Sequence, residues 1–200
     1  FIPSQLGWRF LLMVMRTVYR RTHHPWNNPG EAHYLTFSCF KKRAFLARDR
    51  TRQYFLDALA SARTRHLFDL WAYVIMPTHA HLLLFPRREH YDMGAIETSI
   101  KLSVSRRAMA YLRKHNPDGL RHLATGHIHT PYRFWTSGNG YDQNLVALNE
   151  ARNMATYIHN NPVCAGLCTE AEAWPWSSAR EWIEEGSGPL SIDRDSFPEA

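Results

Sequence analysis

Cysteine is scarce in this 200-residue chain, which has three, and an odd number cannot close a framework of disulfides. That excludes a small disulfide-stapled scaffold and favours a reducing compartment. Cys164 and Cys168 lack a second pair at zinc-site spacing, so we expect no structural zinc. Long apolar runs are also missing, because the run at 10–15 is too short to cross a bilayer. We therefore expect no membrane partner.

Hydrophobic residues make up 44% of the chain and aromatic residues 13%, which supports one sizeable core and argues against a disordered protein. Turn-forming residues lead up to Gly30, and acidic residues gather near the C-terminus. We accordingly divide the chain into a mobile N-terminal extension (1–30), a folded domain (31–182) and an acidic C-terminal tail (183–200).

Acidic charge is in deficit, since the formal net charge is +6 at pH 7. Basic residues cluster at 41–65, where eight Lys/Arg face two Asp, and at 101–121, where six face one Asp. This pattern favours a polyanionic partner such as nucleic acid, although solvated helix faces give the same pattern. The candidate phosphate-binding residues are Lys41, Lys42, Arg43, Arg106, Arg107, Arg113 and Lys114.

Hydrophobic periodicity predicts an α+β fold. The order strand, helix, two strands, helix, strand is the ferredoxin-like split β-α-β pattern, with an antiparallel sheet and both middle helices on one face. An additional C-terminal helix, stopped by Pro162, is left for the other face of the sheet. The expected strands are 33–40, 68–76, 79–85 and 127–135, and the expected helices are 50–66, 93–115 and 144–160.

Two histidines begin the third expected strand. Because side chains alternate along a strand, His79 and His81 share one face, about 6 to 7 Å apart, while Ala80 and Leu82 take the other. Such a pair is suitably spaced to bind a divalent metal. Two ordinary histidines on a solvent-facing strand are the alternative, so a third ligand from elsewhere has to decide.

The last expected helix carries a tyrosine with polar neighbours. Tyr157 and Asn161 are four residues apart and share a helix face, which Asn153 and Glu150 continue. Core residues are expected on the opposite side, at Leu145, Leu148, Ala151, Ala155 and Ile158. Tyr157 is therefore a candidate nucleophile, although a tyrosine at the border of an amphipathic helix is the plainer interpretation.

Four blocks, in this order and spacing, resemble the REP-associated tyrosine transposases, which belong to the single-tyrosine HUH transposases (His, hydrophobic residue, His). The resemblance covers about His33 to Arg180. Thr78 stands where the family often has Asn, and Ala80 is a small hydrophobic residue for the HUH pair. The blocks are His79–His81, Phe134–Asp142, Tyr157–Val163 and Trp174–Ser178.

The resemblance implies a catalytic domain at 31–182 that cleaves and rejoins single-stranded or hairpin DNA through a 5′-phosphotyrosine intermediate. It assigns the nucleophile to Tyr157 and a divalent metal, Mg²⁺ or Mn²⁺, to His79, His81 and Asn161. Histidine ligands lean towards Mn²⁺. It also implies a bacterial, cytoplasmic protein associated with the nucleoid, as either a monomer or a homodimer.

Four alternatives stay open. Tyr141, beside Gly140 in an expected flexible loop, is the secondary candidate for the nucleophile. The chain could instead be a non-catalytic DNA-hairpin-binding protein derived from such an enzyme, or a nuclease that uses water. Three tryptophans could stack on unpaired bases or pack into the core: Trp135, Trp174 and Trp176.

Overall fold

The computed structural model describes residues 27–138 and 140–198. Most of the extension predicted at 1–30 therefore lies outside the described residues. The strands are β1 (Ala32–Ser38), β2 (Phe68–Ile75), β3 (His79–Pro86) and β4 (Tyr141–Leu145). The α-helices are α2 (Asp49–His66), α3 (Met93–His115), α4 (Leu148–Cys164) and α5 (Ala179–Ile183), and the 3-10 turns are η1 (Phe40–Lys42), η2 (Pro117–Leu123) and η3 (Ala171–Ala173).

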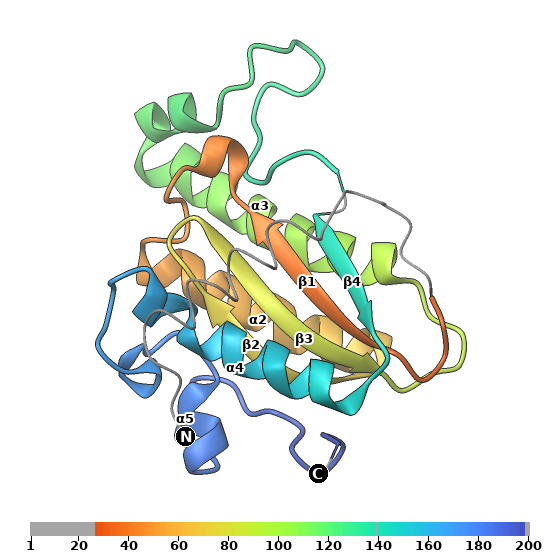
Figure 1. The fold of residues 1–200 in the computed structure, drawn as a ribbon. Helices are drawn as coiled ribbons and strands as arrows, with labels where there is room; N and C mark the ends of the chain where they lie inside the picture. The colour runs from red at the N-terminus through yellow and green to blue at the C-terminus, as the bar shows by residue number, and fades with distance from the viewer. Residues whose placement is uncertain (1–26, 139, 199–200) are drawn as a thin grey trace.

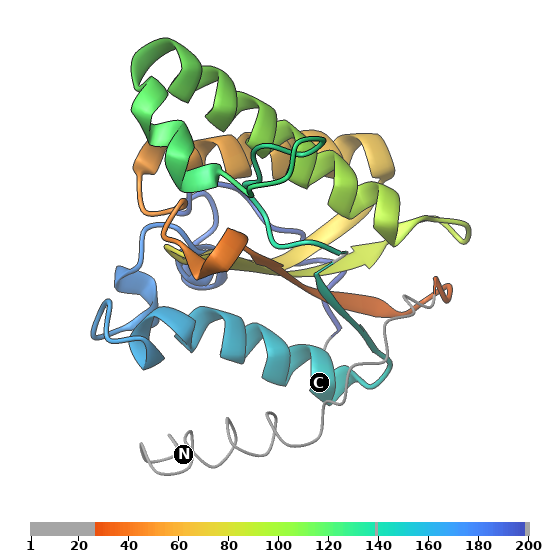
Figure 2. The same cartoon turned by 90° about the horizontal axis from the view of Figure 1, so that it is seen from above.

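The four strands form one antiparallel sheet in the order β2-β3-β1-β4. Helices α2 and α3 cover one face, and α4 lies across the other (Figures 1 and 2). The predicted split β-α-β arrangement is thus confirmed. No described helix is long and apolar enough to cross a membrane.

Strand alternation divides the core between the two faces. Leu35 and Phe37 of β1, with Ala80, Leu82 and Leu84 of β3, pack on the side of α2 and α3. The opposite side holds a second apolar cluster under α4, to which that helix contributes Ala151, Met154, Ala155 and Ile158. Leu148, expected in this stripe, is 58% exposed at the start of α4, so its assignment to the core was wrong.

The prediction of the fourth strand at 127–135 was wrong. That segment is irregular, and the fourth strand is the polar stretch Tyr141–Leu145, paired with β1. Tertiary contacts hold this strand: Asp142 Oδ1 lies 2.8 Å from His33 Nδ1, and the Asn144 amide donates to Glu31 at 2.5 Å. Gly140 precedes it at φ +76°, where a Cβ would lie 2.5 Å from the Thr36 carbonyl oxygen. Tyr141 therefore lies in a strand and not in a loop.

Pro162 does not stop the last long helix, contrary to prediction, but lies buried inside its final turn. The helix continues to Cys164, and the missing N–H of Pro162 removes only the bond to the preceding turn. At the other end, the Glu150 carboxylate accepts hydrogen bonds from the backbone N–H groups of Val146 and Ala147, at 3.1 and 3.2 Å. Glu150 therefore caps α4, which carries Tyr157 to the sheet.

The C-terminal segment covers the outer edge of β2. Trp176 accepts a backbone hydrogen bond from Ile75 at 2.8 Å, and Ser178 donates one to Tyr73 at 3.0 Å. Further on, the Asp193 backbone N–H donates to Leu70 at 2.9 Å. Pairing of this kind removes an exposed strand edge that would otherwise template association. Residues 183–198, set apart by their charge, thus pack on the sheet; the domain boundary at 182 stays a prediction.

Candidate active site

The face of the sheet below α4 carries a row of polar side chains across three strands. Thr36 on β1 is the register partner of His81 on β3 and of Tyr141 on β4. Tyr34, two residues earlier on β1, projects from the same face because side chains alternate. This row interrupts the apolar cluster that otherwise packs against α4.

His81 is the member of this row on β3 and is 4% exposed. Its Nδ1 lies 2.7 Å from the Tyr34 hydroxyl and 3.0 Å from the Thr36 hydroxyl. Its Nε2 is buried and has no hydrogen-bond partner among the described residues. Burial, reinforced by the neighbouring His79, holds the pKa of His81 well below its usual range. His81 is therefore a neutral imidazole with one nitrogen engaged and the other available.

His79 lies beside it, with the two rings 4.7 Å apart between centroids. Burial lowers the pKa of His79, a hydrogen bond with the Asn161 side chain opposes this shift, and the charge of Lys42 adds to it. Its Nδ1 lies 3.0 Å from the Thr78 hydroxyl. The structure thus brings together His79, His81 and Asn161, although they come from β3 and α4.

Tyr157 reaches this cluster from α4. Its ring centroid lies 5.8 Å from that of His81 and 6.2 Å from that of Tyr34, both in edge-on geometry. Burial raises the pKa of the Tyr34 hydroxyl well above its usual range, and its interactions with Tyr157 raise it further. Tyr34 therefore keeps its proton, whereas Tyr157 is only partly buried at the border of the site.

Tyr141, the rival candidate, lies on the same face of the sheet but further from the histidine pair. Thr36 stands between Tyr141 and His81 in the strand register. The Tyr141 ring packs against Tyr34 at 5.9 Å, and its hydroxyl donates to Gln143 Oε1 at 3.1 Å. The geometry thus favours Tyr157 over Tyr141 as the phenol beside the histidines.

The donor set fits a divalent metal in one specific respect. In the tautomer whose Nδ1–H donates to the Tyr34 or Thr36 hydroxyl, the buried Nε2 of the neutral His81 carries the lone pair that a metal takes, and the hydroxyls orient the ring as outer-shell groups do. The set has two histidines and one amide. Within 27–138 and 140–198, no group of three or more His, Cys, Asp or Glu could hold a metal ion.

The basic residues before α2 adjoin this site. Lys41 and Lys42 are exposed and adopt left-handed backbone angles, with φ of 54° and 52°. Such angles are costly for residues other than glycine and tend to occur at functional positions. Arg43, by contrast, donates a hydrogen bond to the His122 carbonyl and is half-buried.

The basic residues on α3 lie on the helix layer that covers the other face of the sheet (Figure 2). Arg106, Arg113 and Lys114 are exposed and form no ion pair with a described residue. Arg107 is engaged, because it pairs with Asp57 at 2.6 Å and covers the Tyr54 ring at 4.2 Å. The structure does not bring this group next to the histidine pair.

The tryptophans pack into the body of the protein. Trp135 is 5% exposed, and its Nε1 donates to the Lys101 carbonyl at 3.0 Å. The Trp174 Nε1 donates to the Ile75 carbonyl at 3.1 Å. The Arg52 guanidinium lies over the rings of Trp174 and Trp176, at 5.1 and 5.4 Å from their centroids. All three rings thus make contacts within the protein, and stacking on bases stays a prediction.

Sequence reasoning missed Tyr34 and Thr36, which hold the buried histidine. The signal was present in strand 33–40, because Leu35 and Phe37 on one face require Tyr34 and Thr36 on the other. What the pattern lacked was the register that sets Thr36 opposite His81. Register depends on pairing between distant strands and is not written in the periodicity of either one.

Comparison with solved structures finds the same architecture. A REP-associated tyrosine transposase bound to a REP hairpin matches with a TM-score of 0.65 and 17% identity, covering 90% of this chain and 98% of that one. A protein from Deinococcus radiodurans R1, provisionally described as a transposase, matches at 18% identity over 72% of this chain and 97% of its own, with a TM-score of 0.41. No protein-family model and no curated protein matches.

This likeness establishes the fold. The solved REP-associated tyrosine transposase shares the α+β fold with a four-stranded antiparallel sheet, which the order of strands and helices predicted. More particularly, the resemblance to the REP-associated tyrosine transposases is confirmed at the level of the fold.

Proposed function

We propose that this protein is a single-tyrosine HUH transposase, which cleaves and rejoins single-stranded or hairpin DNA through a 5′-phosphotyrosine intermediate. One observation carries the proposal: the phenol of Tyr157 lies beside the paired imidazoles, with its ring 5.8 Å from that of His81. A tyrosine beside two neutral histidines in a transposase fold is suited to phosphoryl transfer.

In this proposal His79, His81 and Asn161 hold Mg²⁺ or Mn²⁺. When bound, the ion would neutralise charge on the scissile phosphate and orient it for in-line attack. Tyr34 and Thr36 engage Nδ1 of His81, so its Nε2 is the nitrogen left for ligation. Asn161 lies one turn after Tyr157, so the same helix places both the nucleophile and the third ligand.

Tyr157 supplies the nucleophile. Its hydroxyl oxygen attacks the scissile phosphorus, the bond to the 3′ oxygen breaks, and the phenolic proton is lost while the departing 3′ oxygen gains one. The product is a 5′-phosphotyrosine link and a free 3′-hydroxyl. Because the adduct is itself a phosphodiester, a DNA 3′-hydroxyl can reverse the step and join strands without ATP. Tyr34, which keeps its proton, helps to orient His81 and is not the attacking group.

Substrate binding is assigned to the basic residues. Lys41 and Lys42 lie in η1, and Lys42 is close enough to His79 for its charge to add to the lowering of the His79 pKa by burial. Phosphate contacts of this kind give affinity that falls with salt. The solved structure that shares the fold is bound to a REP hairpin, and we propose hairpin DNA as the substrate here. Other phosphate contacts are proposed at Arg43, Arg106, Arg107, Arg113 and Lys114.

The proposed catalytic domain is 31–182, acting on DNA in the bacterial cytoplasm, with either a monomer or a homodimer as the working form. A non-catalytic hairpin-binding protein is the second candidate. It is favoured by the absence, among the described residues, of a cluster of three His, Cys, Asp or Glu at the site. Such a protein would retain the basic surface but not the strand cleavage.

The test is a covalent-adduct assay on a labelled hairpin with single-stranded flanks, with Mn²⁺ or Mg²⁺ and a denaturing gel. We expect an adduct from the unmodified protein and from Tyr141→Phe, and none from Tyr157→Phe, His79→Ala or His81→Ala. Cleavage that survives Tyr157→Phe but not the histidine substitutions would indicate a nuclease that uses water. Tight hairpin binding without cleavage in either metal would favour the non-catalytic candidate.

A further inference from the structure

A groove of about 580 Å³ lies between α4, α5 and the C-terminal segment 194–198, which lie on the same side of the sheet (Figure 1). We call it the α4 groove, because residues of one face of α4, from Arg152 to His159, form one wall. Tyr157 precedes His159 by two residues and so projects about 200° away around the helix. Neither Tyr157 nor any of the proposed metal ligands lines the groove.

Two arginines give the α4 groove its charge, because among the described residues no carboxylate lines it. Arg152 projects from α4 and donates from Nε and Nη2 to the Pro198 carbonyl, at 3.4 and 3.1 Å. Arg194 comes from the C-terminal segment. His159 adds no charge at neutral pH, because burial lowers its pKa to about 4. The groove therefore carries two positive charges.

The Arg194 guanidinium has no counter-ion in the described part of the chain. Its Nε and Nη2 atoms are buried and have no hydrogen-bond partner there. The adjacent carboxylate of Asp193 is engaged elsewhere, because it pairs with Arg63 and Arg87. Buried charged groups in proteins are normally paired, since an unpaired buried charge costs free energy. Arg194 therefore lacks the partner that a bound anion would supply.

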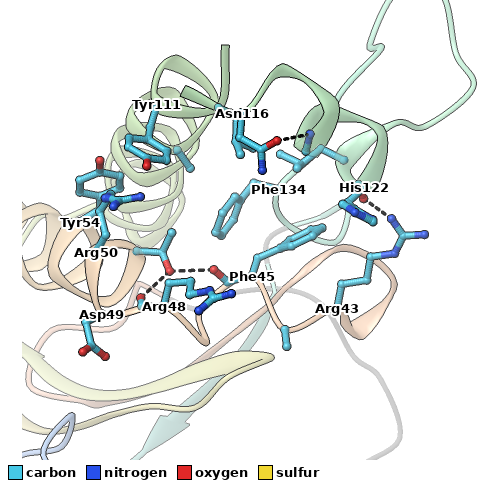
Figure 3. Close-up of a pocket in the computed structure, with 16 residues that line it drawn as sticks. Arg43, Phe45, Arg48, Asp49, Arg50, Tyr54, Tyr111, Asn116, His122 and Phe134 are labelled. Carbon is cyan, nitrogen blue, oxygen red and sulfur yellow. Dashed lines mark hydrogen bonds between the residues drawn. The ribbon is translucent and has the colours of Figure 1, made fainter. Parts of the chain in front are cut away.

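A larger groove, of about 980 Å³ between α2, α3 and η2, differs in this respect (Figure 3). Its Arg50 guanidinium lies over the Tyr111 ring, 3.6 Å from the centroid. Its Arg43 donates a hydrogen bond to the His122 carbonyl. Of these two grooves, the α4 groove is the one lined by an arginine with buried nitrogen atoms that have no partner among the described residues.

The remaining wall of the α4 groove is apolar. Phe197 packs edge-on against the Trp182 ring, with 4.6 Å between the ring centroids, and the Trp182 Nε1 donates to the Trp71 carbonyl at 3.0 Å. These rings are engaged within the protein and serve as walls. Charged groups attract an anion more strongly beside apolar walls, because the local dielectric is low. The planar fork of a guanidinium matches the oxygen atoms of a phosphate, and two cations without a carboxylate favour its double charge.

We propose that the α4 groove binds a phosphate group through Arg152 and Arg194. The inference does not depend on the proposed function. Because Arg152 belongs to α4 and Arg194 to the C-terminal segment, the bound phosphate fastens this segment to the helix that carries Tyr157. Free phosphate compounds and the backbone of a nucleic acid both present such a group, and the test separates these two sources.

The first probe is inorganic phosphate, titrated into the full chain in a calorimeter, in EDTA and at constant ionic strength. We expect saturable binding that is at least about tenfold weaker in Arg194→Gln and in Arg152→Gln, as for the loss of charge-assisted hydrogen bonds. Arg194→Lys keeps the charge but not the fork and should be intermediate. The matched control is Arg121→Gln, an exposed arginine of η2 outside the groove, which should bind phosphate as the unmodified protein does.

Unfolding temperature without phosphate checks folding, and Arg194→Gln should not lower it, because no described side chain pairs with Arg194. The absence of saturable binding, or equal weakening by Arg121→Gln, would overturn the proposal. Glu199 follows Pro198 in the sequence and lies outside the described residues. Phosphate binding seen only in Glu199→Gln would mean that the chain supplies its own anion, which would also overturn the proposal.

The second probe is hairpin DNA, added at saturating concentration before the phosphate titration. If the hairpin abolishes phosphate binding in the unmodified protein, the group belongs to a nucleic-acid backbone. If phosphate still binds, the groove takes a free phosphate compound. Both results support the site, because both require the same two arginines. No cleavage occurs in these measurements, so a failed adduct assay would bear on the proposed function and not on the α4 groove.

Discussion

Along β3, the side chains that face α2 and α3 differ in character from those that face α4. On β3, Ala80, Leu82 and Leu84 face α2 and α3, where they are fully buried among apolar side chains. His81, between them in sequence, faces α4 with a buried nitrogen that has no partner among the described residues. Burying an unpaired polar atom costs free energy, whereas burying apolar side chains supplies it. On β3, the side chains that face α2 and α3 therefore stabilise the fold, whereas His81 on the other side carries a polar atom that is costly to bury.

The largest expected difference is in the free energy of unfolding after substitution of two neighbouring residues of β3. Leu82→Ala should lower the free energy of unfolding by about 2 to 5 kcal/mol, because it opens a cavity in the apolar cluster that packs against α2 and α3. His81→Leu should cost the metal-free protein less, about 1 kcal/mol, because the removal of an unpaired buried nitrogen offsets part of the loss of the hydrogen bonds with Tyr34 and Thr36. Urea unfolding in EDTA measures both. If His81→Leu lowered the free energy of unfolding as much as Leu82→Ala does, the proposed difference between the two sides of β3 would be wrong.

The two faces should also respond oppositely to pH. Burial lowers the pKa of His159 on α4 to about 4, so the unfolded chain binds its proton more tightly, and stability falls as the pH drops from about 6.5 to 4. Burial raises the pKa of Glu97 on α3 to about 7, so this group contributes stability at low pH that is lost as the pH rises from about 4.5 to 7.

Stability measured against pH separates these contributions. His159→Asn should make the loss on acidification shallower, by about 2 kcal/mol between pH 6.5 and 4. Glu97→Gln should make it steeper, because the offsetting protonation is gone. His79 and His81, whose pKa values are also lowered by burial, add to the acid loss in every variant that retains them. If stability depended on pH in the same way in the unmodified protein and in both variants, the assignment of these effects to His159 and Glu97 would be wrong.

Tyr34 tests whether the polar row serves the metal site or only the fold. Tyr34→Phe removes the hydroxyl 2.7 Å from His81 Nδ1 but keeps the ring, so the stability without metal should change by only about 1 kcal/mol. The affinity for Mn²⁺ should fall about tenfold, because an outer-shell partner no longer orients the ligand. Titration calorimetry with Mn²⁺ alone measures this. Unchanged affinity would mean that the hydroxyl has only a structural role.

The smallest expected effect is at η1. Lys41→Gly removes a charge from a left-handed backbone position, so stability should rise by up to about 1 kcal/mol while hairpin affinity falls. The slope of log affinity against log salt should decrease by about one, as for the loss of one phosphate contact. Lys41→Asn, which also tolerates this backbone, is the matched variant for charge alone. Stronger hairpin binding by Lys41→Gly would contradict a role in DNA contact.

The sequence predicted most of the fold, because the periodicities of β1, β3 and α3 are strong. The helix expected at 93–115 has those bounds in the structure. Prediction from the sequence was wrong where tertiary contacts override the local preference for a strand or a loop. Strand β4 is polar and weakly strand-forming, and it is held by pairing with β1 and by the His33–Asp142 contact. The segment at 127–135 is richer in aromatic residues than β4 and was therefore predicted to be the strand. In the structure it is irregular, and its Phe134 and Trp135 are core residues.

The candidate site was predicted in its parts, and the role of each residue stays a prediction. Alternation along β3 put His79 and His81 on one face, and helix periodicity put Tyr157 and Asn161 on another. That these two faces meet depends on the packing of α4 on the sheet, which no local pattern contains.

The proposed function requires that the Tyr157 hydroxyl forms the covalent bond to DNA. Mass spectrometry of the protease-digested adduct, made by the unmodified protein with Mn²⁺ and a flanked hairpin, locates the nucleotide on the chain. We expect a nucleotide remnant on the peptide that contains Tyr157, attached to that side chain. A remnant on Tyr141 or Tyr34 would contradict it.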